Sequence, residues 1–241
     1  MSQLLYLSKR ARPDIQIEVS FLFNRVIGIY TDYYKNLSRL MNYIQGNIGL
    51  PLILSIDKLG NIKWYVDSAF VVHKDMMSHA GGFMNMGTGG AYVHSRKQNL
   101  NTKSSTEAEL VGVDYLLTQL MWTGYFLKEQ GYMIHDNVIY QDNQSAIRLE
   151  NNGRRLIRKS TRHINMRYYF ITDRIVNQES SMGFYPTFDM IGYYFTKALQ
   201  GSQLCRFRNI ICGIHEDDIP AYNASGRDFL EERKLKFSKD K

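Results

Sequence analysis

Three acidic residues stand in contexts that suit the binding of divalent metal ions. Asp67 ends an apolar segment, Glu109 lies near the start of a helical pattern, and Asp142 ends a short apolar run. Carboxylate oxygens are the ligands that suit Mg²⁺. A close cluster of them can hold two ions roughly 4 Å apart for chemistry on a phosphate. We therefore expect Asp67, Glu109 and Asp142 to bind two Mg²⁺ or Mn²⁺ ions.

Two glutamates compete for the middle position of this cluster. Ser104 and Glu107 form the pattern Ser-x-x-Glu, a capping box in which Glu107 can reach back to the amide of Ser104. Glu109 has no such explanation, because it lies beside the apolar row that begins at Leu110, where an unpaired carboxylate is costly. We expect Glu109 to be the ligand, and Glu107 is the alternative.

The elements that must position these residues follow from hydrophobic periodicity. From Ser104, apolar residues recur every three or four positions, which is typical of a helix with one buried face. Strands are predicted over residues 52–56, 62–66, 82–86, 91–95, 138–141 and 182–185, and further helices over 143–149, 164–176 and from 186 onward. This order predicts an α/β fold with a mixed central sheet of about five strands, three antiparallel and then parallel, flanked by helices.

The chain divides into three parts. Residues 1–50 predict a helical segment too small for a core of its own, in which residues 14–26 fit both an alternating strand and one helix face. A helix beginning at Thr31 and ending at Gly46 follows from their capping preferences. Residues 51–213 form the main domain, and the polar tail 214–241 is expected to be loosely ordered.

The chain has 241 residues and a net charge of +7, and the positive excess belongs to the domain rather than to the tail. A basic run after residue 153 suggests a polyanionic partner such as nucleic acid. A solvated surface loop is the alternative. The candidate nucleic-acid-binding residues are Arg154, Arg155, Arg158, Lys159, Arg162 and Arg167.

Composition gives no sign of secretion or of a membrane span. No run approaches the roughly 18 apolar residues needed to cross a bilayer, and the N-terminal charges follow the apolar patch, unlike a signal peptide. Cys205 and Cys212 are the two cysteines, and they indicate buried thiols in a reducing compartment. We expect an intracellular protein, either cytoplasmic or nuclear, with no membrane partner.

Five short motifs occur in a fixed order along the chain. They are SKRARPDI at Ser8–Ile15, KSSTEAE at Lys103–Glu109, YQDNQSAI at Tyr140–Ile147, TRHINMRY at Thr161–Tyr168 and FTKAL at Phe195–Leu199. In this order they resemble the end of the polyprotein of copia-type long-terminal-repeat retrotransposons, over roughly residues 4–213.

The resemblance implies an RNase H-like fold with Asp67, Glu109 and Asp142 as catalytic metal ligands. Their order Asp, Glu, Asp is that of ribonuclease H, whereas transposase and integrase relatives carry Asp, Asp, Glu. The family substrate is the RNA strand of an RNA–DNA hybrid, which proteins read through shape and 2′-hydroxyls. Residues 1–50 would be the trailing segment of an upstream reverse transcriptase region, and we expect no polymerase activity from this chain by itself.

One position departs from the family pattern. Gly192-Tyr193 stands where the family motif has Ala-Asp, so a fourth carboxylate is replaced by Tyr193. Asp189 is a possible auxiliary residue if one helix covers both positions, because residues four apart share a face. The alternative for Asp189 is a partner of the helix dipole.

His163 is the other possible auxiliary residue. Some ribonucleases H use a mobile histidine to help product leave, and capping of the following helix is the alternative for His163.

Two functional interpretations follow. The first is a ribonuclease H-type endonuclease with activity weakened by Tyr193. The second is a non-catalytic, nucleic-acid-binding remnant of a decayed element. The intact trio of carboxylates favours the first interpretation and Tyr193 favours the second.

Overall fold

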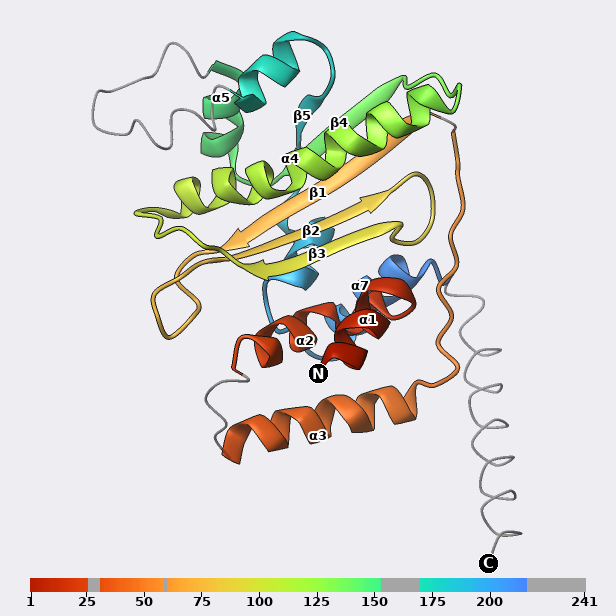
Figure 1. Cartoon of the computed structure of the whole chain (residues 1–241), viewed down its shortest axis with the longest axis vertical. Helices are drawn as coiled ribbons and strands as arrows, with labels where there is room; N and C mark the ends of the chain where they lie inside the picture. The colour runs from red at the N-terminus through yellow and green to blue at the C-terminus, as the bar shows by residue number, and fades with distance from the viewer. Residues whose placement is uncertain (26–30, 59, 153–169, 216–241) are drawn as a thin grey trace, which may run out of the picture.

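A mixed five-stranded sheet forms the centre of the molecule, in the order β3-β2-β1-β4-β5 (Figure 1). The computed structural model describes residues 1–25, 31–58, 60–152 and 170–215. The strands are β1 Asn61–Ala69, β2 His79–Asn85, β3 Tyr92–Lys97, β4 Asp136–Gln141 and β5 Ser181–Phe184. The first three pair antiparallel, whereas β4 is parallel to β1 and β5 is parallel to β4. The predicted mixed sheet of five strands is confirmed.

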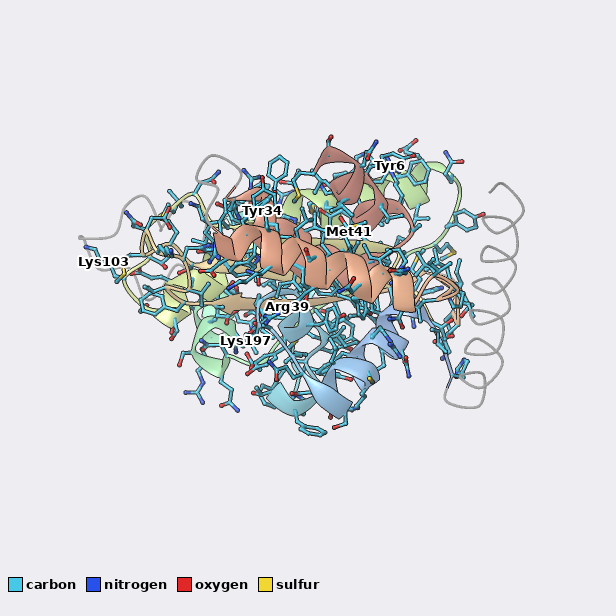
Figure 2. The ribbon with its side chains drawn as sticks, turned by 90° about the horizontal axis from the view of Figure 1, so that it is seen from below. Tyr6, Tyr34, Arg39, Met41, Lys103 and Lys197 are labelled. Atoms are coloured by element: carbon cyan, nitrogen blue, oxygen red, sulfur yellow. The ribbon has the colours of Figure 1, made fainter. Side chains whose placement is uncertain are left out.

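Helices cover both faces of this sheet (Figure 1). On one side lie α4 Ser105–Glu129 and α5 Gln144–Asn152, and on the other α1 Ser2–Arg10, α2 Gln16–Phe23, α3 Thr31–Gly46 and α7 Gly201–Cys212. Figure 2 shows α3 from outside, with Tyr34, Arg39 and Met41 on the exposed surface of the molecule. Short 3-10 helices, η1 Pro13–Ile15, η3 Thr187–Asp189 and η4 Ile191–Phe195, connect the longer elements.

Alternation along β1 produces a core on each face of the sheet. Ile62, Trp64 and Val66 are buried in a cluster with the apolar stripe of α4. Tyr65 points the other way, into a cluster formed with η4 and α7. Successive strand residues face opposite sides of a sheet, so Asp67 lies on the same face as Tyr65, towards η4.

The start of α4 is capped much as the sequence predicts. Ser104 Oγ accepts a hydrogen bond from the Glu107 amide at 3.2 Å. The reciprocal bond differs, because the Glu107 carboxylate accepts from the Lys103 amide at 2.7 Å rather than from that of Ser104. Glu107 is therefore occupied by the cap. Glu109, two residues further along, is buried instead.

Two expected elements do not form. Residues 52–56 are not a strand. Instead they run beside the β2–β3 hairpin and α7 through isolated backbone bonds, such as Ile53 N to Cys212 O at 2.8 Å and Ser55 N to Thr88 O at 3.2 Å. The prediction of a long helix from residue 186 is also wrong. Met190 has an extended backbone, with φ −65° and ψ 103°, and it separates η3 from η4.

Three smaller predictions agree with the structure fully or in part. The helix predicted over 143–149 is α5, in which Asn143 Oδ1 accepts from the amides of Ser145 and Ala146. The helix predicted over 164–176 is seen only for residues 170–176, because its first part lies outside the described residues. Of the two thiols expected to be buried, Cys212 is buried and Cys205 is exposed.

The N-terminal helices pack as a layer against the sheet side that carries η4. Residues 16–23 are helical, which decides between the two patterns seen in the sequence. Asp14 is buried against Arg12 at 2.7 Å and accepts from Tyr43 at 2.9 Å. Its backbone carbonyl accepts from the Tyr194 hydroxyl at 2.8 Å, so the layer is bonded directly to η4.

Candidate metal centre

Three carboxylates meet at one edge of the sheet. Asp67, Glu109 and Asp142 each offer an oxygen, and these oxygens lie within 4.8 Å of one another. Asp67 lies near the end of β1, and Asp142 directly follows β4. Because β1 and β4 are parallel neighbours, their carboxyl ends meet at the same edge, where the first turns of α4 deliver Glu109.

Two glycines allow the backbones to approach closely enough for this meeting. A Cβ on Gly112 of α4 would lie 2.3 Å from Ser68 Oγ, the residue after Asp67. A Cβ on Gly192 of η4 would lie 2.9 Å from the Asp67 amide nitrogen. At Asp67 and Ser68, β1 is therefore closely packed on both faces, by α4 on one and by η4 on the other.

Glu109 is a buried member of the cluster whose charged form is disfavoured. Its Oε2 atom is buried, and it has no hydrogen-bond partner among the residues that the structure describes. Burial, followed by the charges of Asp67 and Asp142, raises the pKa of Glu109 well above its usual value. A carboxylate in this situation is costly unless a positive partner neutralises it, which is the condition that a divalent cation would meet.

Asp67 and Asp142 are oriented by threonine hydroxyls. Thr196 donates to Asp67 Oδ2, and Thr187 donates to Asp142 Oδ2 at 2.8 Å. Burial raises the pKa of Asp67, while Lys197 and the Thr196 hydroxyl oppose that shift. The oxygen-only donor set, the orphaned Oε2 and the mutual repulsion of the three groups fit a hard divalent ion such as Mg²⁺ or Mn²⁺.

Tyr193 contributes no carboxylate to this edge. Its ring instead receives the Lys197 ammonium, which lies 3.6 Å from the ring centroid. A cation over an aromatic face is attracted by the ring quadrupole. Lys197 therefore contacts Tyr193 and also lowers the pKa of Asp67 through its charge, against the larger effect of burial.

Asp189 does not join the three carboxylates. It is not part of the group within 4.8 Å, and it pairs with Arg206 at the surface. Asp189 and Tyr193 would share a face only on one continuous helix, and the extended backbone of Met190 interrupts that helix. The structure therefore gives no support to Asp189 as a substitute ligand.

The remaining predicted site residues lie outside the described part of the chain. They are His163, Arg154, Arg155, Arg158, Lys159, Arg162 and Arg167. Their proposed contacts with nucleic acid stay predictions from the sequence.

One further buried carboxylate, Glu150, is not among the residues that the sequence analysis singles out. Glu150 in α5 is fully buried, and neither carboxylate oxygen has a hydrogen-bond partner in the described part of the chain. Burial raises the pKa of Glu150 well above its usual value. Its charge also contributes to raising the pKa of Glu109. The signal was available in the sequence, since Glu150 follows Ala146 by four residues on what is now seen to be the buried face of α5.

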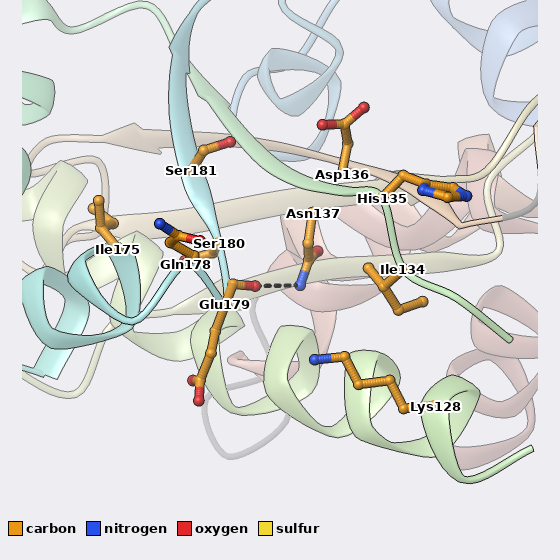
Figure 3. A pocket seen from close by; sticks show the side chains of 10 residues that line it. All are labelled: Lys128, Ile134, His135, Asp136, Asn137, Ile175, Gln178, Glu179, Ser180 and Ser181. Carbon is orange, nitrogen blue, oxygen red and sulfur yellow. Dashed lines mark hydrogen bonds between the residues drawn. The ribbon is translucent and has the colours of Figure 1, made fainter. Parts of the chain in front are cut away.

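A separate cavity of about 260 Å³ lies at the other end of β4 (Figure 3). Asp136, which begins β4, lines it together with Lys128, His135 and Ser180. The Asn137 side chain crosses one wall and donates to the Glu179 carbonyl oxygen at 3.2 Å. This cavity is separated from Asp142 by the whole length of the strand.

Strand order and site together define the class of protein. Three antiparallel strands continued by two parallel ones, with α4 across one face and acidic residues at the carboxyl ends of β1 and β4, make an RNase H-like α/β fold. No helix among the described residues combines the length and apolar character needed to cross a membrane.

Known proteins with similar sequences are transposon polyproteins. The retrovirus-related Pol polyprotein from transposon TNT 1-94 of Nicotiana tabacum is 28% identical over 182 residues, covering 75% of this chain and 13% of the polyprotein. That from transposon RE1 of Arabidopsis thaliana is 26% identical over 202 residues, covering 83% of this chain and 14% of the polyprotein. The resemblance to copia-type polyproteins is confirmed, and the chain spans only about a seventh of such a relative's length.

Family models and solved structures were compared with the chain as well. No protein-family model matches the chain. Among solved structures, LC11-RNase H1 in complex with an RNA/DNA hybrid is 11% identical, with a TM-score of 0.40, and the match covers 54% of this chain and 88% of that one.

Proposed function

We propose that this domain hydrolyses the RNA strand of an RNA–DNA hybrid in a divalent-metal-dependent reaction, with activity weakened at the position of Tyr193. The observation that carries the proposal is the meeting of Asp67, Glu109 and Asp142 within 4.8 Å. The similarity to transposon Pol polyproteins supports it. The order of the three acids along the chain, which is that of ribonuclease H, supports it as well.

The residues of this chain would bind the metal ions and orient the carboxylates that hold them. Asp67, Glu109 and Asp142 would hold the ions, with Thr196 and Thr187 fixing one oxygen of Asp67 and of Asp142 respectively. Bound Mg²⁺ or Mn²⁺ supplies activation of the attacking water and stabilisation of the leaving oxygen. Tyr193 supplies no negative charge for this purpose, which is the reason for expecting slow turnover.

The test is cleavage of a labelled RNA–DNA hybrid in Mg²⁺ or Mn²⁺ by a series of variants. We expect Asp142→Asn to abolish cleavage and Tyr193→Asp to accelerate it at least tenfold, since loss of even an indirect metal partner costs about 10–100-fold. Tyr193→Phe, which removes only the hydroxyl, should leave the rate unchanged. A Tyr193→Asp rate equal to that of the wild type would refute our account of the fourth position.

The second candidate is a nucleic-acid-binding domain without cleavage, which Tyr193 favours. Its signature would be salt-sensitive binding of the hybrid, since phosphate contacts release counterions, together with no cleavage by either the wild type or Tyr193→Asp. Charge reversal at Arg154, Arg155, Arg158 and Lys159 should then weaken binding at low salt, and unchanged binding would remove these residues from the interface.

A further inference from the structure

A row of hydrogen-bonded polar side chains leads from the half-buried His73 to η4, the element that Thr196 directly follows. His73 lies in the loop between β1 and β2, His79 begins β2, and Ser95 lies in β3. His73 Nε2 is 3.0 Å from His79 Nδ1, and His79 Nε2 is 2.8 Å from Ser95 Oγ. Ser95 Oγ in turn donates to the carbonyl oxygen of Phe195 in η4 at 2.8 Å.

The buried end of this row fixes the direction of every proton in it. The Phe195 carbonyl can only accept, so the single Ser95 proton points to it. Ser95 must then accept from His79, which places the His79 proton on Nε2 and leaves Nδ1 as an acceptor for His73 Nε2–H. His79 is thereby held in one neutral tautomer, and burial, followed by the charge of His73, lowers the pKa of His79 to about 3.

The N-terminal layer closes over this row through one aromatic ring. Phe21 of α2 stacks on both imidazoles, with ring centroids 4.9 Å from His73 and 4.7 Å from His79. The interplanar angles are 19° and 24°, so the phenyl ring lies nearly parallel to both. Stacking of this kind adds to the stabilisation that comes from burying the rings.

The far end of the row adjoins the metal centre, and η4 is closely packed on the sheet there. Thr196, which donates to Asp67, directly follows Phe195. A Cβ on Gly81 of β2 would lie 2.6 Å from Thr196 Cγ2 and 2.9 Å from Phe195 Cβ, so η4 sits tightly on the sheet. A displacement of the Phe195 carbonyl therefore moves the hydroxyl that orients Asp67.

We propose that Phe21, His73, His79 and Ser95 are positioning residues through which the N-terminal helical layer sets the orientation of Asp67. This inference deepens the proposed function, and it rests on that function only where metal binding is the readout. By this inference, residues 16–23 affect the metal centre although they lie far from its ligands in the sequence.

The experiment uses the whole chain and two substitutions along the row. Ser95→Ala removes the bond to Phe195, and Phe21→Leu removes the stacked ring. Phe23→Leu is the matched control, because Phe23 lies in the same helix and is 49% exposed. We expect Ser95→Ala and Phe21→Leu to weaken Mn²⁺ binding in calorimetry by about tenfold, the lower end for loss of an indirect metal partner, and Phe23→Leu to leave it unchanged.

Two further readouts do not depend on metal. Nitrogen chemical shifts of His79 should show the Nε2–H tautomer, and Ser95→Ala should accelerate amide hydrogen exchange at Thr196 and Lys197. A wild-type protein that fails to bind Mn²⁺ would overturn the proposed metal centre, while the tautomer and the exchange rates would still decide this inference. An Nδ1–H tautomer, or unchanged exchange in Ser95→Ala, would overturn the positioning role.

Discussion

At the scale of single residues, Glu150 is a buried acid with no hydrogen-bond partner among the described residues. Its folded-state pKa is raised above the ordinary carboxyl value, so the folded protein favours the protonated form. The stability that this form contributes is complete below the unfolded pKa of about 4.3 and is lost as pH rises through the folded pKa.

Replacing this acid should therefore stabilise the protein in a pH-dependent way. We expect Glu150→Gln to raise the free energy of unfolding in urea by about 1–3 kcal/mol near pH 8, the cost of an unsatisfied buried group, and to change it little near pH 4. The control is Glu129→Gln, which removes an exposed acid at the end of α4. An equal effect at both pH values would contradict the explanation.

Lys197 is a second residue whose charge should have opposite effects with and without metal. Its ammonium offsets the negative charge around Asp67, but it would repel a bound cation. We expect Lys197→Gln to destabilise the metal-free protein and to tighten Mn²⁺ binding about fivefold, or roughly 1 kcal/mol for one charge in a water-like dielectric. Calorimetry at low salt measures this change, and weaker binding would show that Lys197 supports the site.

At the scale of elements, the close contact between α4 and β1 should depend on Gly112. We expect Gly112→Ala to lower the free energy of unfolding by about 1–3 kcal/mol, as for other overpacked contacts, because the new Cβ would lie 2.3 Å from Ser68 Oγ. The matched control is Gly124→Ala in the same helix, where the nearest atom would be 3.6 Å away.

The two substitutions should differ in sign. Gly124→Ala should stabilise the protein by up to about 1 kcal/mol through helix propensity. Urea unfolding of both variants distinguishes the contact from the propensity, and two equal effects would show that α4 does not approach β1 as described.

The elements that sequence alone could predict are those that local signals specify. The β1 alternation, the Ser104 cap and the stripe of α4 are local, and with them the expectation that Glu109 rather than Glu107 faces inward. Residues 52–56 look like a strand but find their partners in α7 and the hairpin, which no local pattern reveals. The break at Met190 is likewise set by packing of η4 on the sheet, so the helical spacing of Asp189 and Tyr193 does not apply in the folded protein.

At the scale of the whole molecule, specific side-chain contacts connect the N-terminal helical layer to η4 and to the sheet. Tyr194 donates to the Asp14 carbonyl, and Phe21 stacks on His79. We expect a chain lacking residues 1–50 to lose several kcal/mol of stability, a large share of the roughly 5–15 kcal/mol of an ordinary domain. Calorimetric unfolding of both chains tests this, and equal midpoints would favour independent folding of residues 51–213.

The central claim is that Asp67, Glu109 and Asp142 bind divalent metal, and Mn²⁺ titration by calorimetry tests it most directly. The comparison is between wild type, Glu109→Gln and Glu107→Gln, because Glu107 is already engaged in the helix cap. We predict saturable binding by wild type and by Glu107→Gln, and affinity at least tenfold weaker in Glu109→Gln. No binding by wild type, or equal affinity in all three proteins, would contradict the account.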